Sequence, residues 1–164
     1  MDNPIQQVYD AIWHLIESNE ELTELVKLNN RIRFEDRDPM KDEISTSDLP
    51  EIRLVPVGGS SSQGISSSQD RLIKRFRIDI SSGTQDVSEL FELEWRLFCA
   101  LSPWQEVLYG LTLNGCKFVI ACRGLSIREG ITQSDLNRGI RGWSSMWECE
   151  IEMFFNKSSL SSMT

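Results

Sequence analysis

The spacing of the hydrophobic positions predicts two main amphipathic helices. Within residues 4–18, apolar side chains recur at intervals of three and four, which places them on one helical face. Asn3 suits the N-cap of this helix and Pro4 suits its first position. A short turn of helix is expected at 20–28, and a second main helix at 86–101.

The helix predicted at 86–101 has an unusually broad apolar arc. We expect its core stripe to be Val87, Leu90, Phe91, Leu97, Phe98 and Leu101, widened by Leu93 and Trp95. An arc of this width indicates contact with more than a sheet alone. Pro103 is expected to end the helix.

Alternating apolar and polar residues predict the strands. They are expected at 31–35, 51–57, 71–81, 117–127 and 143–155. In the last strand, Glu148, Glu150 and Glu152 alternate with apolar side chains and are expected to form a solvated row. Asn114-Gly115 between two apolar runs predicts a tight hairpin turn, because both turn residues need positive φ.

Two segments predict long loops. Nine of the 13 residues at 58–70 are Gly or Ser, a composition typical of flexible coil, so we expect a mobile loop joining two strands. A second long loop, polar and with several glycines, is expected at 128–142, before the last strand.

The order of the elements predicts an α+β class. A helix, strands, a second main helix and further strands follow along the chain, with turns that favour hairpins over crossovers. We expect a mainly antiparallel sheet with the two main helices packed on one face and long mobile hairpin loops. The 164 residues suit one domain, expected at 1–155, with a flexible tail at 156–164.

Charge and composition narrow the function classes. The chain carries 17 Lys and Arg against 25 Asp and Glu, a net charge of −8. This balance disfavours a general nucleic-acid binder and a protein attracted to anionic membranes. No apolar run approaches the roughly 18 residues of a membrane span, and the start of the sequence lacks the features of a signal peptide. We expect a cytoplasmic protein whose four cysteines are free thiols: Cys99, Cys116, Cys122 and Cys149.

The sequence shows no catalytic or metal-binding motif. GxSxG, HExxH and glycine-rich phosphate loops are missing, and the cysteines lack the paired spacing of a zinc site. The one histidine, His14, lies away from the apolar stripe of its helix. We expect no enzyme activity, no metal and no cofactor. Acid–base chemistry by Glu148 and Glu150 is the minor alternative.

Four arginines gather before the last strand of this acidic chain. They are Arg123, Arg128, Arg138 and Arg141. One interpretation is a solvated loop. The other is that these arginines pair with acidic groups of a neighbouring copy, with the three glutamates of the last strand as candidate partners. Such charge asymmetry suits head-to-tail contacts that close into a ring.

Two tryptophans are further interface candidates. Trp143, at the end of the predicted loop, suits an interface anchor or a core position equally. Trp95, on the broad arc of the helix at 86–101, is a candidate for contact with a neighbouring subunit.

Several segments, in this order, give the chain a family resemblance. The helix at its start carries PIQQVYDAIWHLIESN, a strand pair with a long loop follows, and a helix and a closing strand with GWSSMWECEIEMFF complete the set. Over about residues 4–155, this arrangement resembles the tail terminator family of tailed bacteriophages.

The resemblance implies a structural role in the virion tail and neck. Tail terminators are small α+β proteins that assemble as a hexameric ring on the head-proximal end of the tail tube. The ring stops tube polymerisation and joins the tail to the head, and genomic DNA passes through its lumen without specific binding. The implied partners are further copies, the tail tube protein and a neck or head-completion protein, met in the host cytoplasm during assembly. The family has no catalytic residues.

Other interpretations stay open from the sequence. A head–tail connector or stopper shares the size and ring symmetry of a terminator. A monomeric cytoplasmic adaptor module and a small hydrolase with an unrecognised site are more distant alternatives.

Overall fold

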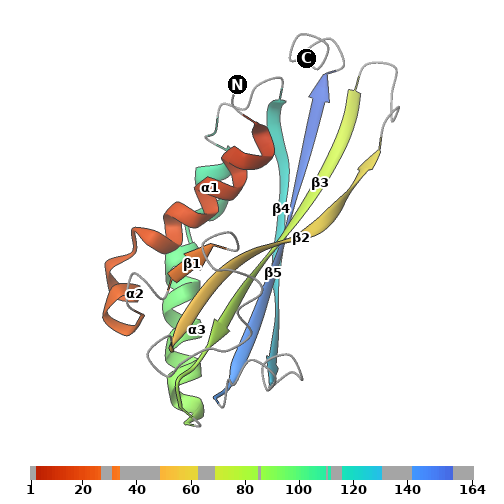
Figure 1. The fold of residues 1–164 in the computed structure, drawn as a ribbon. Helices are drawn as coiled ribbons and strands as arrows, with labels where there is room; N and C mark the ends of the chain where they lie inside the picture. The colour runs from red at the N-terminus through yellow and green to blue at the C-terminus, as the bar shows by residue number, and fades with distance from the viewer. Residues whose placement is uncertain are drawn as a thin grey trace.

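A mainly antiparallel sheet and a helical layer make up the fold. The computed structural model describes residues 3–26, 31–33, 49–62, 69–84, 86–109, 111, 116–130 and 142–156. Within them the strand order is β1-β2-β3-β5-β4, and the helices lie on one side of the sheet (Figure 1). Neighbouring strands are antiparallel except β1 and β2. The predicted α+β class is confirmed.

Helix α1 (Pro4–Glu17) begins as the sequence predicts. Asn3 Oδ1 accepts hydrogen bonds from the backbone N–H groups of Ile5 at 2.9 Å and Gln6 at 3.4 Å. These bonds satisfy two of the donors that a helix start leaves unpaired. The buried face of α1 packs into the core, where the ring of Tyr9 lies 5.5 Å from that of Phe76. The short helix predicted next is α2 (Glu20–Leu25), capped by the Asn19 side chain.

The hairpin of β2 (Glu51–Ser62) and β3 (Gln69–Ser81) is longer than predicted. Residues 58–62 and 69–70 were expected in a loop, yet they belong to the strand ladder. Glycine and serine are poor strand formers in general, but a ladder needs only backbone groups, which β3 supplies here. The central part of the predicted loop, 63–68, lies outside the described residues.

One glycine of this hairpin is required by packing. A Cβ placed on Gly59 would clash with the backbone carbonyl of Ile73 on β3. The two backbones therefore approach each other more closely than a side chain allows, which explains a glycine inside a strand. On the other side of β2, strand β1 (Arg31–Arg33) pairs with Ile52, Arg53 and Leu54.

Strand β5 (Ser144–Asn156) lies between β3 and β4 (Cys116–Gly130). Its predicted core face is confirmed, since these side chains are buried: Trp147, Cys149, Ile151, Met153 and Phe155. Residues 128–130 were expected in a loop and instead pair in β4. The predicted turn at Asn114-Gly115 and residues 131–141 lie outside the described part of the chain.

Helix α3 (Val87–Leu101) follows the predicted bounds, whereas α4 (Trp104–Tyr109) was not predicted. Pro103 follows the end of α3, and its carbonyl oxygen accepts a hydrogen bond from the N–H of Val107 at 3.0 Å, within α4. Six residues are too short for helical periodicity to stand out in a sequence. Trp104 and Leu108 of α4 are buried.

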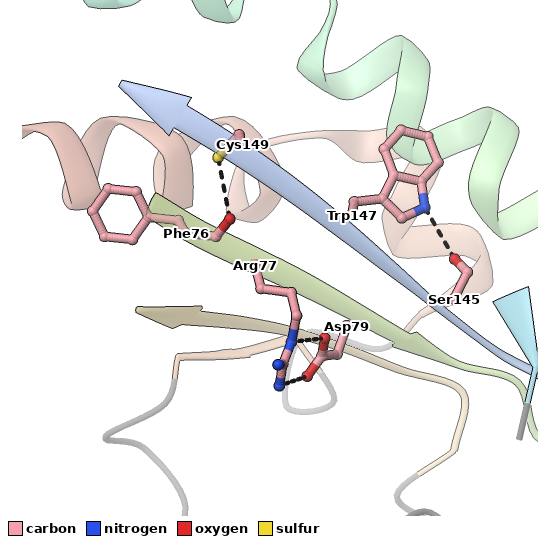
Figure 2. Close-up of polar contacts among 6 residues, drawn as sticks. All are labelled: Phe76, Arg77, Asp79, Ser145, Trp147 and Cys149. Atoms are coloured by element: carbon pink, nitrogen blue, oxygen red, sulfur yellow. Dashed lines mark hydrogen bonds and ion pairs between the residues drawn. The ribbon is translucent and has the colours of Figure 1, made fainter. Parts of the chain in front are cut away.

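Two polar groups inside the core, on Trp147 and Cys149, have hydrogen-bond partners. The indole N–H of Trp147 donates to Ser145 Oγ at 3.0 Å, and Cys149 Sγ lies 3.5 Å from the carbonyl oxygen of Phe76 (Figure 2). Cys149 is a buried free thiol and Cys99 a half-buried one, as predicted for these two. No helix in the described ranges has the length and hydropathy to cross a membrane.

Candidate interaction surface

Helix α3 exposes a row of large apolar side chains. Val87, Phe91, Trp95 and Phe98 are spaced by four, four and three residues, so they share one helical face. Their exposed fractions are 40%, 52%, 58% and 52%. The rings of Trp95 and Phe98 are stacked, with centroids 5.8 Å apart and planes 21° from parallel. We call these four residues the α3 apolar stripe.

The prediction that Val87, Phe91 and Phe98 lie in the core is wrong. The helix buries its opposite face, which carries Leu90, Leu93, Leu97, Ala100 and Leu101. Both faces of α3 are apolar, so spacing alone did not show which one meets the sheet. The breadth of the apolar arc was the signal that a second surface exists.

Hydrogen bonds fix the start of α3. Asp86 is its N-cap, and Asp86 Oδ1 accepts the backbone N–H of Ser88 at 3.0 Å. Hydrogen bonds from the Ser88 hydroxyl, and then from its backbone N–H, lower the pKa of Asp86 below its ordinary value. Glu89 Oε1 accepts the backbone N–H of Gly83 at 2.6 Å. These contacts fix the position of Val87, the first residue of the α3 apolar stripe.

Arg96 ties α3 to α2. Its guanidinium donates to Glu92 on the same helix at 2.9 Å and to Glu21 of α2 at 2.8 Å. These two hydrogen bonds, first that of Glu92 and then that of Glu21, raise the pKa of Arg96. Arg96 bonds to Glu92 and Glu21, and none of these three residues is part of the α3 apolar stripe.

The sheet face away from the helices carries ion pairs within the chain. Arg75 Nε lies 2.9 Å from Glu150 Oε2, and Arg71 pairs with Glu152. Both pairs join β3 to β5 across the ladder. Arg77 makes two hydrogen bonds to the carboxylate of Asp79, at 2.6 and 2.9 Å (Figure 2).

The glutamates of β5 do not form the solvated row that was predicted. Only 7% of the Glu152 side chain and 27% of the Glu150 side chain are exposed. Glu148 is half-buried. The pattern of one strand cannot show that the neighbouring strand supplies cations, and this is why the prediction failed. Pairing of these glutamates with another copy stays a prediction, and Glu150 and Glu152 already have partners in their own chain.

The predicted arginine cluster is only partly described. Arg123 and Arg128 lie in β4, in register with Glu150 and Met146 of β5. Arg138 and Arg141 lie outside the described residues. The register thus brings Arg123 opposite one of the glutamates that it was expected to meet in another copy.

Trp143 directly precedes β5 and lies beside Ser82, which directly follows β3. Its backbone N–H donates to Ser82 Oγ at 2.9 Å, and its carbonyl oxygen accepts the backbone N–H of Ser82 at 2.8 Å. The residue is 37% exposed. Trp143 is therefore neither a core side chain nor a fully exposed one, and its predicted role as an interface anchor stays a prediction.

The described part of the chain shows no candidate metal centre. No group of three or more His, Cys, Asp or Glu side chains there is placed to hold an ion. His14 is exposed on α1. The surfaces that stand out are the α3 apolar stripe and the two edges of the sheet.

Comparisons with known proteins give matches to solved structures only. No family model and no curated protein matches the sequence. One similar structure is that of bacteriophage SPP1 gp17 protein, with 18% identity, a TM-score of 0.46, and coverage of 93% of this chain and 91% of that chain. Another is a chain from the virion of a native gene transfer agent particle, with 9% identity, a TM-score of 0.48, and coverage of 90% and 93%.

Proposed function

We propose that this chain is a structural virion protein of a tailed bacteriophage, namely a tail terminator. In this role, six copies form a ring that caps the tail tube, stops its polymerisation and joins the tail to the neck. The sequence resembles the tail terminator family over about residues 4–155, and one structural observation supports the same role. That observation is the α3 apolar stripe, an exposed apolar surface of a kind that is uncommon on monomeric proteins.

The composition of the stripe favours contact with another protein. Monomeric proteins rarely expose contiguous apolar patches of large side chains, and such patches usually mark interaction sites. Tryptophan is among the residues that contribute most to protein interfaces. Because the rings of Trp95 and Phe98 are already stacked, little side-chain freedom is lost when a partner covers them. We assign the stripe to the contact between neighbouring subunits of the ring.

Charge supports the passage of DNA through such a ring. The net charge of −8 opposes tight binding of phosphates. The proposed role is therefore non-enzymatic, with genomic DNA as cargo and not as a ligand. The other proposed partners are the tail tube protein and a neck or head-completion protein, with assembly in the host cytoplasm.

Tube assembly in vitro tests the proposal. The tail tube protein of the same phage is polymerised with and without this chain, and tube lengths and ends are measured by electron microscopy. We expect added protein to shorten the tubes and to leave a ring at one end. Tubes of unchanged length and bare ends would contradict the terminator role.

Co-purification separates the tail terminator role from the nearest alternative. A head–tail connector or stopper would ignore the tube protein and bind the protein on the portal side of the neck. Co-purification with that protein, and not with the tube protein, would favour this alternative. A monomer that binds neither would favour an adaptor module.

A further inference from the structure

Both edges of the sheet present backbone groups. In the parts of the chain that the structure describes, β4 pairs only with β5, and β2 beyond Leu54 pairs only with β3. An edge strand carries a row of N–H and C=O groups that a further strand can pair with. The two edges therefore qualify as places where another chain can extend the sheet.

The far half of β2 is accessible. Residues 56–61 are exposed, and the far ends of β2 and β3 lie on the side of the sheet away from α1 and α3 (Figure 1). Pro56 lacks an N–H, and the register shifts between Pro56 and Gly58, where Gly58 has φ of 115°. The stretch able to pair thus begins after this bulge, at 58–62.

Pairing with β3 holds residues 58–62 in place. Its ladder with β3 runs without a shift from the Gly58 and Arg75 pair to the Ser62 and Arg71 pair. At the same level, the ion pairs of Arg71 with Glu152 and of Arg75 with Glu150 join β3 to β5. Residues 58–62 themselves carry no charged side chain and no proline, the usual devices that protect an edge from pairing.

We propose that the β2 edge at 58–62 of one copy pairs with the β4 edge of the next copy, so that the sheets of neighbouring subunits join. Successive strands in the order β2-β3-β5-β4 alternate in direction. When copies follow one another head to tail around a ring, β4 of the next copy therefore runs antiparallel to β2. This inference rests on the proposed ring.

A second copy fits these edges better than a bound peptide. A peptide strand would cover one edge and leave the other exposed. Head-to-tail pairing gives both residues 58–62 of β2 and part of β4 a partner strand in every copy, and ring closure leaves neither of these stretches without one. Strand pairing uses backbone groups. The glycines and serines at 58–62 therefore need no matching side chains on the other copy.

Photo-crosslinking tests the joint without assuming its register. A benzophenone amino acid is placed at Ser60, and the variant is mixed with wild-type protein labelled with nitrogen-15. After irradiation, crosslinked peptides are mapped by mass spectrometry, and the isotope label identifies links between different copies. We expect links from position 60 to residues 116–130 of another copy. The same group at Glu24, exposed on α2, should give no link to those residues.

The outcomes separate this inference from the proposed function. Ring-shaped hexamers whose links from position 60 map to another segment, or to added tail tube protein, would overturn the joint and leave the ring intact. Links to 116–130 in assemblies that are not closed rings would support the joint and contradict the ring. A monomer without links between copies would overturn both.

Discussion

At the scale of single residues, Gly142 shows how tightly the start of β5 is packed. A Cβ at this position would clash with the carbonyl oxygen of Ser82 and lie 2.7 Å from both Ser82 Oγ and the carbonyl oxygen of Thr84. Ser82 is fully buried and bonded to Trp143, so it has little room to move. A side chain at 142 therefore forces the segment before α3 away from β5.

We predict that Gly142→Ala lowers the free energy of unfolding by about 2 kcal/mol, the typical cost of overpacking. Urea denaturation measures this change. Gly83→Ala is the matched control, because its Cβ would meet Leu49 at an ordinary 3.4 Å, and it should change stability by less than about 0.5 kcal/mol. Equal losses in the two variants would contradict the packing described at Ser82.

The N-cap of α3 gives a prediction on pH. Because hydrogen bonds from Ser88 lower the pKa of Asp86 in the folded protein, its ionised form stabilises the fold at pH values above 3.8, its ordinary pKa. This contribution is lost as the pH falls through the lowered pKa. We expect Asp86→Ala to be less stable than wild type at neutral pH, with a difference that shrinks on acidification.

Asp86→Asn is the control for charge, since asparagine also caps helices. It should retain part of the stability at neutral pH. Thermal unfolding from pH 7 to pH 3 measures all three proteins. A difference between wild type and Asp86→Ala that stays constant over this range would contradict the role of the ionised carboxylate.

At the scale of elements, α1, α2, α3 and most strands could be predicted from the sequence. α1 and α3 have strong periodicity and good caps, and β3 and β5 alternate clearly, so their bounds agree within one or two residues. The ladder at 58–62 could not be predicted, because only its pairing with β3 makes glycine and serine extended. α4 was not predicted because its six residues are too few to show a helical period in the sequence.

The candidate site was predicted less well than the fold. The breadth of the arc indicated a second surface on α3, yet Phe91 and Phe98 were assigned to the core stripe and Trp95 to its widened margin, and all three are more than half exposed. The role of Trp95 in contact with a neighbouring subunit stays a prediction. The charges of β5 were assigned to solvent because their partners lie about 75 residues earlier in the chain, on β3. Long-range partners of this kind do not appear in a local pattern.

The cross-strand ion pairs give a prediction on the β3–β5 ladder. A double-mutant cycle with Arg71→Ala and Glu152→Ala should give a coupling of about 1 kcal/mol, because the Glu152 side chain is only 7% exposed. The pair of Arg96 and Glu92, on the surface of one helix, should give a smaller coupling. Urea denaturation measures both cycles. A larger coupling for the helical pair would contradict the argument from burial.

The α3 apolar stripe gives a prediction on assembly. Trp95→Ser combined with Phe98→Ser should abolish association between copies and leave thermal stability nearly unchanged, since both side chains are more than half exposed. Sedimentation velocity and circular dichroism measure the two effects. Tyr109→Ser, which removes an aromatic side chain that is 51% exposed on α4, should leave association intact. Unchanged association of the double variant would contradict the assignment of the stripe.

At the scale of the whole molecule, the proposed ring uses two separate surfaces of each copy. The helical layer presents the α3 apolar stripe, and the sheet presents the edges of β2 and β4, whose strands run in opposite directions. Pairing of the β2 edge with the β4 edge is a contact between two different surfaces, because one is built from β2 and the other from β4. Head-to-tail contacts between different surfaces generate rings when the rotation closes.

Native mass spectrometry over a range of protein concentrations tests this account most directly. The protein is measured alone and with the tail tube protein of the same phage. We predict a closed species of six copies, present in at least one of the two samples and without a ladder of open intermediates. A strict monomer at every concentration, with and without the tube protein, would contradict the proposal that this chain is a ring-forming tail terminator.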